Sequence, residues 1–341
     1  MKLNKKYYSV IIVGLLLFTS LNVYAVTTIK THAVTEIFSF STSIDEEGQY
    51  LDIQMSNAQK DIHAGSKYLL PSKEITYTFP INTQIDSVQI YPSSIHSMVT
   101  QQSPQEMPTP VLIGTRESID HDEYMTSNSD WFSYDIGTGI IDNIRQKILK
   151  IRLHPVKYDE NTQMLTWCDQ MDVTIEKTKT NTKVTENTFV EDYSFVIITI
   201  EDYMDELSPL VIHKSNNGIT TKVVSLSDIT NSVYFPSEGR DLQEQIKFFI
   251  KNSIESWNTF NIMLVGSSED IPSRETHVQV SSSDTEIFVS DLYYADIYDD
   301  TLNFSSWDTN DNDIFAEYRW EGKTDSLDFY PDVHFGRLAC V

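Results

Sequence analysis

Residues 26–177 alternate apolar and polar side chains in short runs, the pattern of strands with one buried face. No strong helical stripe lies between these runs. Prolines and the pair Gly137 and Gly139 are interpreted as turn formers that separate the strands. The region is therefore predicted to be a β-rich domain, and its clearest strands are expected at 75–79, 88–91, 147–153 and 171–176.

Residues 189–341 alternate buried strands with helices. The strands are continuous apolar runs rich in β-branched residues, which are typical of strands covered on both faces. This β-α-β-α-β order predicts a parallel, doubly wound sheet that binds ligands beyond the carboxyl ends of its strands. The expected elements are a strand at 195–200, a helix with Leu207, Leu210 and Val211 on one face, a strand at 221–226, a helix at 241–257 and a strand at 261–265.

The connections carry their own signals. In the first helix, Ser208 is a possible N-cap, Pro209 suits the first turn and Gly218 lies where a C-terminal cap belongs. Residues 178–188 are polar, rich in threonine and without periodicity, so they are predicted to be an exposed linker open to proteases. The loop 266–274 is expected to leave a carboxyl end of the sheet.

Residues 1–25 have the organisation of a secretory signal peptide. Three lysines precede a short apolar run at 10–18, and small residues occupy the expected cleavage positions, Val23 and Ala25. A transmembrane anchor is the alternative, but the run is about ten residues long where a span needs about 20. No second apolar span follows, so the mature chain is expected to be secreted or held at the cell surface without a membrane span.

The composition narrows the class of partner. The 341 residues include 50 acidic and 25 basic side chains, a net charge of −25 that repels phosphate backbones, so no nucleic-acid partner is expected. The same acidic excess suits an extracellular protein or one that binds hard cations such as Ca²⁺. The two cysteines, Cys168 and Cys340, make no disulfide framework and are expected to be free thiols.

Five stretches of the second domain follow one another in a fixed order: FVIITIEDYMDELSPLVIHKSNNGITTKVVSL, NIMLVGSSEDIPSRE, SDLYYAD, SWDTNDND and YPDVHFGRLA. Together they resemble the start of the gingipain-type cysteine peptidase domain, peptidase family C25. Residues 26–177 are similar to the β-rich propeptide of that family around 64–71 and 153–158. The resemblance implies a caspase-like fold, with a parallel sheet flanked by helices, and a secreted cysteine endopeptidase precursor whose propeptide contacts the catalytic domain.

The resemblance also implies a catalytic chemistry. The family uses a Cys-His dyad: the thiolate attacks the scissile carbonyl of a protein or peptide substrate, and the imidazole protonates the leaving amine. In the family both residues follow the motif that here is Gly336-Arg337, so the dyad is expected beyond Val341 and no catalytic residue is assigned within the chain. Cys340 and His334 match neither dyad segment and are expected to be structural.

One acidic loop has the spacing of a cation site. Its oxygen-bearing side chains stand at every second position, and flexible oxygen sets of this kind suit Ca²⁺. The loop resembles the calcium loops of family members but has Asp313 where glycine permits a tight turn. A register shifted to Asp311 and Asp313, or a solvated acidic turn without metal, are the alternatives. The expected ligands of a structural Ca²⁺ are Asp308, Asn310, Asn312 and Glu317.

Some questions stay open at this stage. Residues 290–296 match a family motif whose acids either join the metal site or cap a turn. Besides the peptidase precursor, the sequence allows a catalytically inactive, calcium-stabilised secreted or surface binding module. A generic secreted β-rich adhesin is a third function, against which the α/β pattern after residue 189 argues.

Overall fold

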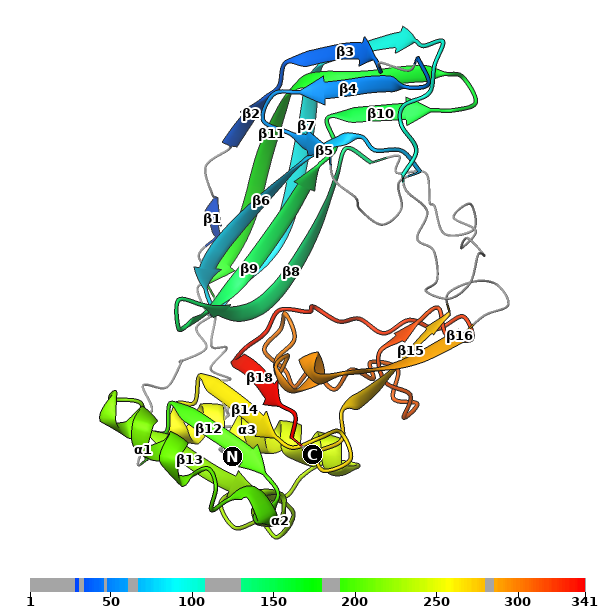
Figure 1. The fold of residues 1–341 in the computed structure, drawn as a ribbon. Helices are drawn as coiled ribbons and strands as arrows, with labels where there is room; N and C mark the ends of the chain where they lie inside the picture. The colour runs from blue at the N-terminus through cyan, green and yellow to red at the C-terminus, as the bar shows by residue number, and fades with distance from the viewer. Residues whose placement is uncertain are drawn as a thin grey trace, which may run out of the picture.

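The computed structural model describes residues 28–30, 34–45, 48–60, 67–107, 130–179, 191–279 and 285–340. The predicted signal peptide and most of the predicted linker lie outside these residues. In the described part of the chain, no helix combines the length and the apolar character needed to cross a bilayer. Figure 1 shows a β-rich part that ends at residue 179 and an α/β part that begins at residue 191.

The β-rich part is built from antiparallel strands around one apolar core. Its longest pairing joins β7 (Thr83–Val99) to β11 (Met164–Lys179) along almost the full length of both strands. Pro92 lies within β7, whose described partner strand is β11. Proline lacks an amide hydrogen, and at this position no second described strand needs one for pairing. The remaining strands are β1 (Thr28–Lys30), β2 (Val34–Ile37), β3 (Phe40–Ile44), β4 (Leu51–Met55), β5 (Gln59–Lys60), β6 (Pro71–Pro80), β8 (Phe132–Ile141), β9 (Ile144–Leu153) and β10 (Val156–Asp159).

Three sequence predictions for this part can be compared with the strands. The four predicted strands are confirmed, since they lie within β6, β7, β9 and β11. β11 continues through Lys179, so the first two residues of the predicted linker are strand. The interpretation of Gly137, Gly139 and Pro92 as turn formers was wrong, because the two glycines lie inside β8 and Pro92 lies inside β7. Glycine weakens a strand but lets another backbone or ring approach closely, which is its use here.

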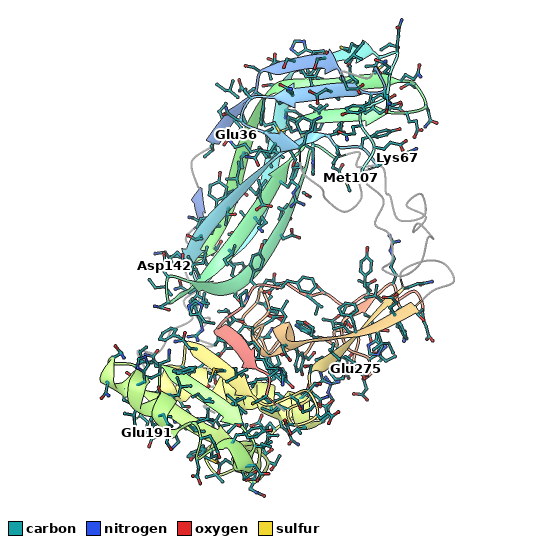
Figure 2. The ribbon with its side chains drawn as sticks, viewed as in Figure 1. Glu36, Lys67, Met107, Asp142, Glu191 and Glu275 are labelled. Carbon is teal, nitrogen blue, oxygen red and sulfur yellow. The ribbon has the colours of Figure 1, made fainter. Side chains whose placement is uncertain are left out.

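The hairpin β8–β9 turns instead at Asp142 and Asn143. Ile141 pairs with Ile144, which leaves a two-residue loop, and Asp142 and Asn143 have φ of 51° and 60°. Positive φ at both central positions is the geometry of a type I′ turn, which matches the twist of paired strands. Figure 2 shows Asp142 at the end of the β-rich part that faces the α/β part.

The α/β part contains the predicted parallel sheet, in the strand order β13-β12-β14-β18. Alternate side chains of its central strand pack on opposite faces. Val196 and Ile198 share a core with α3, while Phe195 and Ile197 pack with Leu207 beside α1. Helices therefore cover both faces, as a doubly wound sheet requires. The elements are β12 (Phe195–Thr199), η2 (Glu201–Tyr203), α1 (Ser208–Asn216), β13 (Thr221–Ser225), α2 (Leu226–Thr230), α3 (Leu242–Trp257), β14 (Asn261–Val265), η3 (Asp291–Tyr294) and β18 (His334–Leu338).

The helix ends agree with the sequence signals with one exception. Pro209 lies in the first turn of α1, and Gly218 follows the helix with φ of 77°, as predicted. Ser208 is not the N-cap: that position is held by Leu207, without a side-chain hydrogen bond, and Ser208 is already helical. In α3, Asp241 is a true N-cap, since its side chain accepts a hydrogen bond from the N–H of Glu244 at 2.8 Å.

A small sheet between β14 and β18 was not predicted. It consists of β15 (Arg274–Gln279), β16 (Thr285–Ser290) and β17 (Glu317–Tyr318), in the order β16-β15-β17. Figure 1 shows this sheet extending to one side of the parallel sheet. The crossover from β14 to β18 thus carries both this sheet and the acidic loop.

Candidate functional site

The carboxyl ends of the parallel strands lie at one edge of the sheet, and the loop after β14 is fixed there by Arg337. Arg337 lies near the end of β18, and its Nη1 donates to the carbonyl oxygens of Gly266, Ser267 and Ile271 at 3.3, 3.2 and 2.9 Å. The side chain of Asp270 also accepts from the N–H and the hydroxyl of Ser267, both at 2.9 Å. The loop predicted to leave this edge is therefore held by hydrogen bonds to the sheet.

Arg337 also explains the first acid of the 290–296 motif. Its Nε and Nη2 donate to the two carboxylate oxygens of Asp291 at 2.6 and 2.7 Å, a bidentate pair. Burial raises the pKa of Asp291, but hydrogen bonds from Arg337 and Ser273 together with the charge of Arg337 outweigh it, so the net shift of this pKa is downward. Asp291 thus holds η3 against the carboxyl edge.

The other polar residues of the motif have structural partners too. The hydroxyl of Ser290 accepts from the N–H of Leu292 at 3.3 Å and caps η3. Asp296 is fully buried and accepts hydrogen bonds from the indole of Trp307 and from the hydroxyl of Ser305. Of the two roles left open by the sequence, turn capping is seen at Ser290, and neither acid joins the acidic loop.

The described thiols and imidazoles do not form a dyad. Cys168 lies in the β-rich core, where burial raises its pKa to about 11. Cys340 follows β18, and its thiol donates to the carbonyl of Leu338 at 3.6 Å. His334 is the first residue of β18, and its Nε2 lies 3.1 Å from Oδ1 of Asn143. Cys340 follows the other end of this strand, which is about 13 Å long at about 3.3 Å a residue. Both cysteines are free thiols, as predicted.

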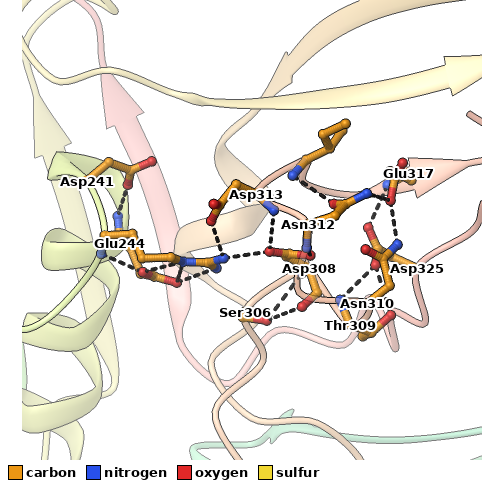
Figure 3. Close-up of polar contacts among 12 residues, drawn as sticks. Asp241, Glu244, Ser306, Asp308, Thr309, Asn310, Asn312, Asp313, Glu317 and Asp325 are labelled. Carbon is orange, nitrogen blue, oxygen red and sulfur yellow. Dashed lines mark hydrogen bonds and ion pairs between the residues drawn. The ribbon is translucent and has the colours of Figure 1, made fainter.

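The acidic loop brings the four predicted metal ligands together (Figure 3). The Nδ2 atoms of Asn310 and Asn312 donate to Oε2 of Glu317 at 2.5 and 3.0 Å. The N–H of Asn312 donates to Oδ1 of Asp308 at 3.0 Å. Asp313 has φ of 62°, the left-handed conformation for which calcium loops use glycine. The loop is therefore folded around the oxygens of the predicted set.

The donor chemistry of this loop fits a hard cation. Glu317 is 2% exposed, and its Oε1 is buried without a hydrogen-bond partner. A buried carboxylate oxygen in that condition lacks the donor or positive charge that burial normally requires. Rotation of an asparagine amide by 180° exchanges its nitrogen and oxygen, so Asn310 and Asn312 can each present an oxygen toward Glu317. Carboxylate and amide oxygens are the ligands that Ca²⁺ takes.

Arg240 limits how much negative charge the loop can offer. Its guanidinium donates to Oδ2 of Asp308 at 2.5 Å and to Oδ1 of Asp313 at 2.9 Å, and it also pairs with Glu244 of α3. The described residues contain no group of three or more His, Cys, Asp or Glu side chains placed to hold a metal. A cation in this loop would therefore rely on the two amide oxygens besides Asp308 and Glu317.

A further site, not predicted in detail, is the contact between the hairpin β8–β9 and the α/β part. The hydroxyl of Thr138 donates to the carbonyl of Tyr298 at 3.1 Å, and the N–H of Ile140 donates to the carbonyl of Pro331 at 2.8 Å. Arg145 donates through Nη2 to the carbonyl of Thr259 at 2.7 Å. These partners precede β14 and β18 or follow η3, so the hairpin lies at the amino-terminal ends of the strands, away from the carboxyl edge.

The comparisons with known proteins bear on the α/β part. The family model described as peptidase family C25 matches residues 190–340. Over these residues, called the C25 segment below, the chain is similar to peptidase family C25. No curated protein matches the chain.

Two solved structures are similar to the chain at low identity. A complex of Porphyromonas gingivalis RgpB pro- and mature domains is 10% identical, with a TM-score of 0.27 over 57% of this chain and 93% of that chain. A structure concerned with the zymogenic latency of gingipain K from Porphyromonas gingivalis is 12% identical, with a TM-score of 0.27 over 44% of this chain and 98% of that chain. TM-scores of this size do not establish a common fold.

Sequence reasoning missed the residues that join the β-rich part to the C25 segment. Thr138, Arg145 and Lys147 are polar residues on a β-hairpin, a pattern that by itself indicates a solvated strand face. The signal that was available is the Gly-Thr-Gly run in β8, since glycine inside a strand marks a close approach by another segment. The residues that approach β8 are 328–332 of the C25 segment, which are remote from β8 in the sequence.

Proposed function

We propose that the chain is the precursor form of a secreted cysteine endopeptidase with a caspase-like catalytic domain. The observation that supports this most is the C25 match over 190–340, which falls on a parallel sheet with an ordered loop at its carboxyl edge. Ligands of open α/β sheets bind at such edges. Proteins or peptides are the proposed substrates, because hydrolysis of peptide bonds is the activity that defines a peptidase family.

The reacting groups are proposed to come from residues beyond Val341. In the described residues Cys340 and His334 lie toward opposite ends of β18, and their side chains bond to other residues rather than to each other. Cysteine peptidases need a thiolate for attack and a nearby imidazole to protonate the leaving amine. Residues 191–340 supply the scaffold on which that pair would be placed, and Arg337 keeps the carboxyl edge rigid.

The β-rich part is proposed to be the propeptide. Its hairpin β8–β9 contacts the C25 segment through a buried hydrogen bond of Thr138 and a partly buried one of Arg145, and the linker predicted at 178–188 would connect the two parts. The hairpin reaches the amino-terminal ends of β14 and β18, so it would restrain the catalytic domain from the side opposite the carboxyl edge. Cleavage of the linker would then leave this contact as the attachment between propeptide and enzyme.

The location of the dyad can be tested with fluorescently labelled casein. We expect the 341-residue chain, and its Cys340→Ala variant, to show no hydrolysis above buffer. Thiol-dependent hydrolysis that Cys340→Ala abolishes would overturn the proposed location. A protein extended beyond Val341 should hydrolyse casein, and faster after linker cleavage; an intact linker with the full cleaved rate would refute the propeptide role. An extended protein with no activity at all would favour the alternative, an inactive calcium-stabilised secreted or surface module.

We also propose the acidic loop as a structural calcium site with Asp308, Asn310, Asn312 and Glu317 as ligands. The unpartnered oxygen of buried Glu317 is the observation that favours it. A ligand that binds the folded state raises the unfolding temperature, and Ca²⁺ at 100 times its Kd would add about 2.7 kcal/mol. The proposal needs no catalytic activity for its test.

The matched pair Glu317→Gln and Asp311→Asn separates this register from the shifted one. Both changes remove one negative charge from the loop, but Asp311 is exposed and Glu317 is buried. We expect added Ca²⁺ to raise the unfolding temperature of the wild type and of Asp311→Asn, and to leave Glu317→Gln unchanged. The opposite order would favour the shifted register, and no shift in any of the three proteins would favour a solvated turn.

A further inference from the structure

Three aspartates lie together where the hairpin β8–β9 meets the α/β part. Asp296 and Asp332 are fully buried, and Asp328 is half-buried at the edge of an open cavity of about 640 Å³. Oδ2 of Asp328 accepts from the N–H of Thr138 at 3.1 Å, and Oδ1 of Asp332 lies 3.3 Å from the hydroxyl of Thr138. Thr138, a neutral residue, supplies these hydrogen bonds, and the charges that the hairpin brings are those of Arg145 and Lys147 in β9.

In the described part of the chain, no cation forms a salt bridge with the three carboxyl groups, although the charge of Lys247 opposes the rise in the pKa of Asp296. Lys147 donates to the carbonyl of Asp300, and Lys247 donates to the carbonyl of Ser305. Arg145 donates to the backbone carbonyl of Asp332 at 3.1 Å rather than to its side chain. The charged and titratable groups that face the cluster or line the cavity beside it are Lys247 of α3, Tyr298, Asp299 and Asp300 after η3, Tyr134 and Asp135 of β8, Arg145, Lys147, Lys150 and Arg152 of β9, and Tyr330.

Burial disfavours the charged form of a carboxyl group and so raises its pKa. Burial raises the pKa of Asp332 to about 7, helped by the charge of Asp296 and opposed by the N–H groups of Tyr298 and Ile297. Burial, and then repulsion by the charge of Asp296, raises the pKa of Asp328. Burial also raises the pKa of Asp296. Oδ1 of Asp296 is buried without a partner. A proton shared between the facing carboxyl groups of Asp296 and Asp328 would supply the missing hydrogen bond.

We propose that Asp296, Asp328 and Asp332 form a proton-stabilised latch, which keeps the hairpin β8–β9 seated on the α/β part while the carboxyl groups are protonated and releases it as they ionise. As a statement about latency this rests on the proposed propeptide role. The latch itself is a property of the contact and can be measured without any peptidase activity.

The direction of the pH effect follows from proton linkage. When the hairpin leaves, Asp328 and Asp332 meet water, where a carboxyl group titrates near pH 4. The seated state has the higher pKa values, so it binds more protons. The contribution of these protons to the stability of the seated state, relative to the unseated state, is complete below about pH 4 and declines as the pH rises. It is lost once the pH exceeds the pKa of the seated state, which is about 7 for Asp332. Between those limits each carboxyl group weakens seating by up to about tenfold per pH unit.

Hydrogen exchange of the full chain measures this opening directly. The N–H groups of Thr138 and Ile140 are bonded across the contact, so their protection reports whether the hairpin is seated. After correction for the intrinsic exchange rate, we expect their protection to fall at least tenfold between pH 5 and pH 8. Amides of the β6–β9 pairing within the β-rich part should change much less. Equal protection at both pH values would overturn the latch.

A double variant separates the latch from general loosening. Asp328→Asn with Asp332→Asn keeps the shape and replaces each protonated carboxyl group with a neutral amide, so protection should become nearly independent of pH. Asp270→Asn, in the loop at the opposite edge, should keep the wild-type dependence. The same pH slope in the double variant refutes the proposal. If that variant does not fold, carbon-13 titration of the wild-type carboxyl groups decides: at least two aspartates must titrate above pH 6, and titration of all below pH 5 rejects the latch.

Discussion

Replacement of Gly137 by alanine would place a methyl group where Tyr330 of the α/β part now lies. An ideal Cβ at Gly137 would be 2.1 Å from Cδ2 of Tyr330 and 3.0 Å from Oδ2 of Asp328. Carbon atoms pack at roughly 3.5–4.0 Å, so the ring or the strand must move by about 1.5 Å. Overpacking of this kind costs about 1–3 kcal/mol. That corresponds to a roughly 5- to 150-fold shift toward the unseated hairpin.

The matched control is Gly336→Ala. Gly336 is also a strand glycine, but a Cβ there would meet no atom within 4 Å. Hydrogen exchange at Ile140 should therefore speed up at least fivefold in Gly137→Ala, and less than twofold in Gly336→Ala. Exchange at Ile198, inside the parallel sheet, should be the same in both proteins. If Gly137→Ala exchanges like the wild type at Ile140, the close contact between β8 and Tyr330 does not hold the two parts together.

Two further results are expected. Arg337→Lys keeps the charge but loses the bidentate pair with Asp291 and most bonds to the loop after β14, so thermal unfolding should show a loss of about 1–3 kcal/mol. Because the pKa of Asp291 is lowered in the fold, the wild-type advantage should be present near neutral pH and shrink as the pH falls below about 4; an advantage that grows in acid would contradict the pairing. A thiol reagent at pH 8 should modify one cysteine of the native chain and both in denaturant, since Cys168 is fully buried with its pKa raised to about 11; rapid labelling of two thiols in the native chain would show that the β-rich core is open.

The parallel sheet was predictable because its signals are local. The apolar run at 195–200 and the one-sided stripe from Leu242 to Trp257 are each sufficient to identify an element, and both are confirmed. The small sheet was missed for the opposite reason. β16 is exposed along almost its whole length, so no alternation of buried and exposed positions marks it in the sequence.

The candidate sites divide in the same way. The acidic loop is contiguous in sequence, so its spacing alone predicted that Asp308 and Glu317 would come together. The contact at Thr138 joins residues more than 150 positions apart, including Asp332. No pattern in either segment of the sequence indicates that the two segments meet. Buried hydrogen bonds between polar residues become visible only when the topology is known.

The order of the chain gives the hairpin β8–β9 a part in assembly. β1 pairs with β11, so the β-rich part can complete its pairing as soon as residue 179 has been synthesised. Ribosomes add about 5–20 residues each second, so the hairpin precedes its partners at 328–334 by about 10–35 s. β18, which pairs with β14, is the last of the described strands to be synthesised. It therefore docks beside β14 and next to the hairpin β8–β9, both of which have been synthesised before it.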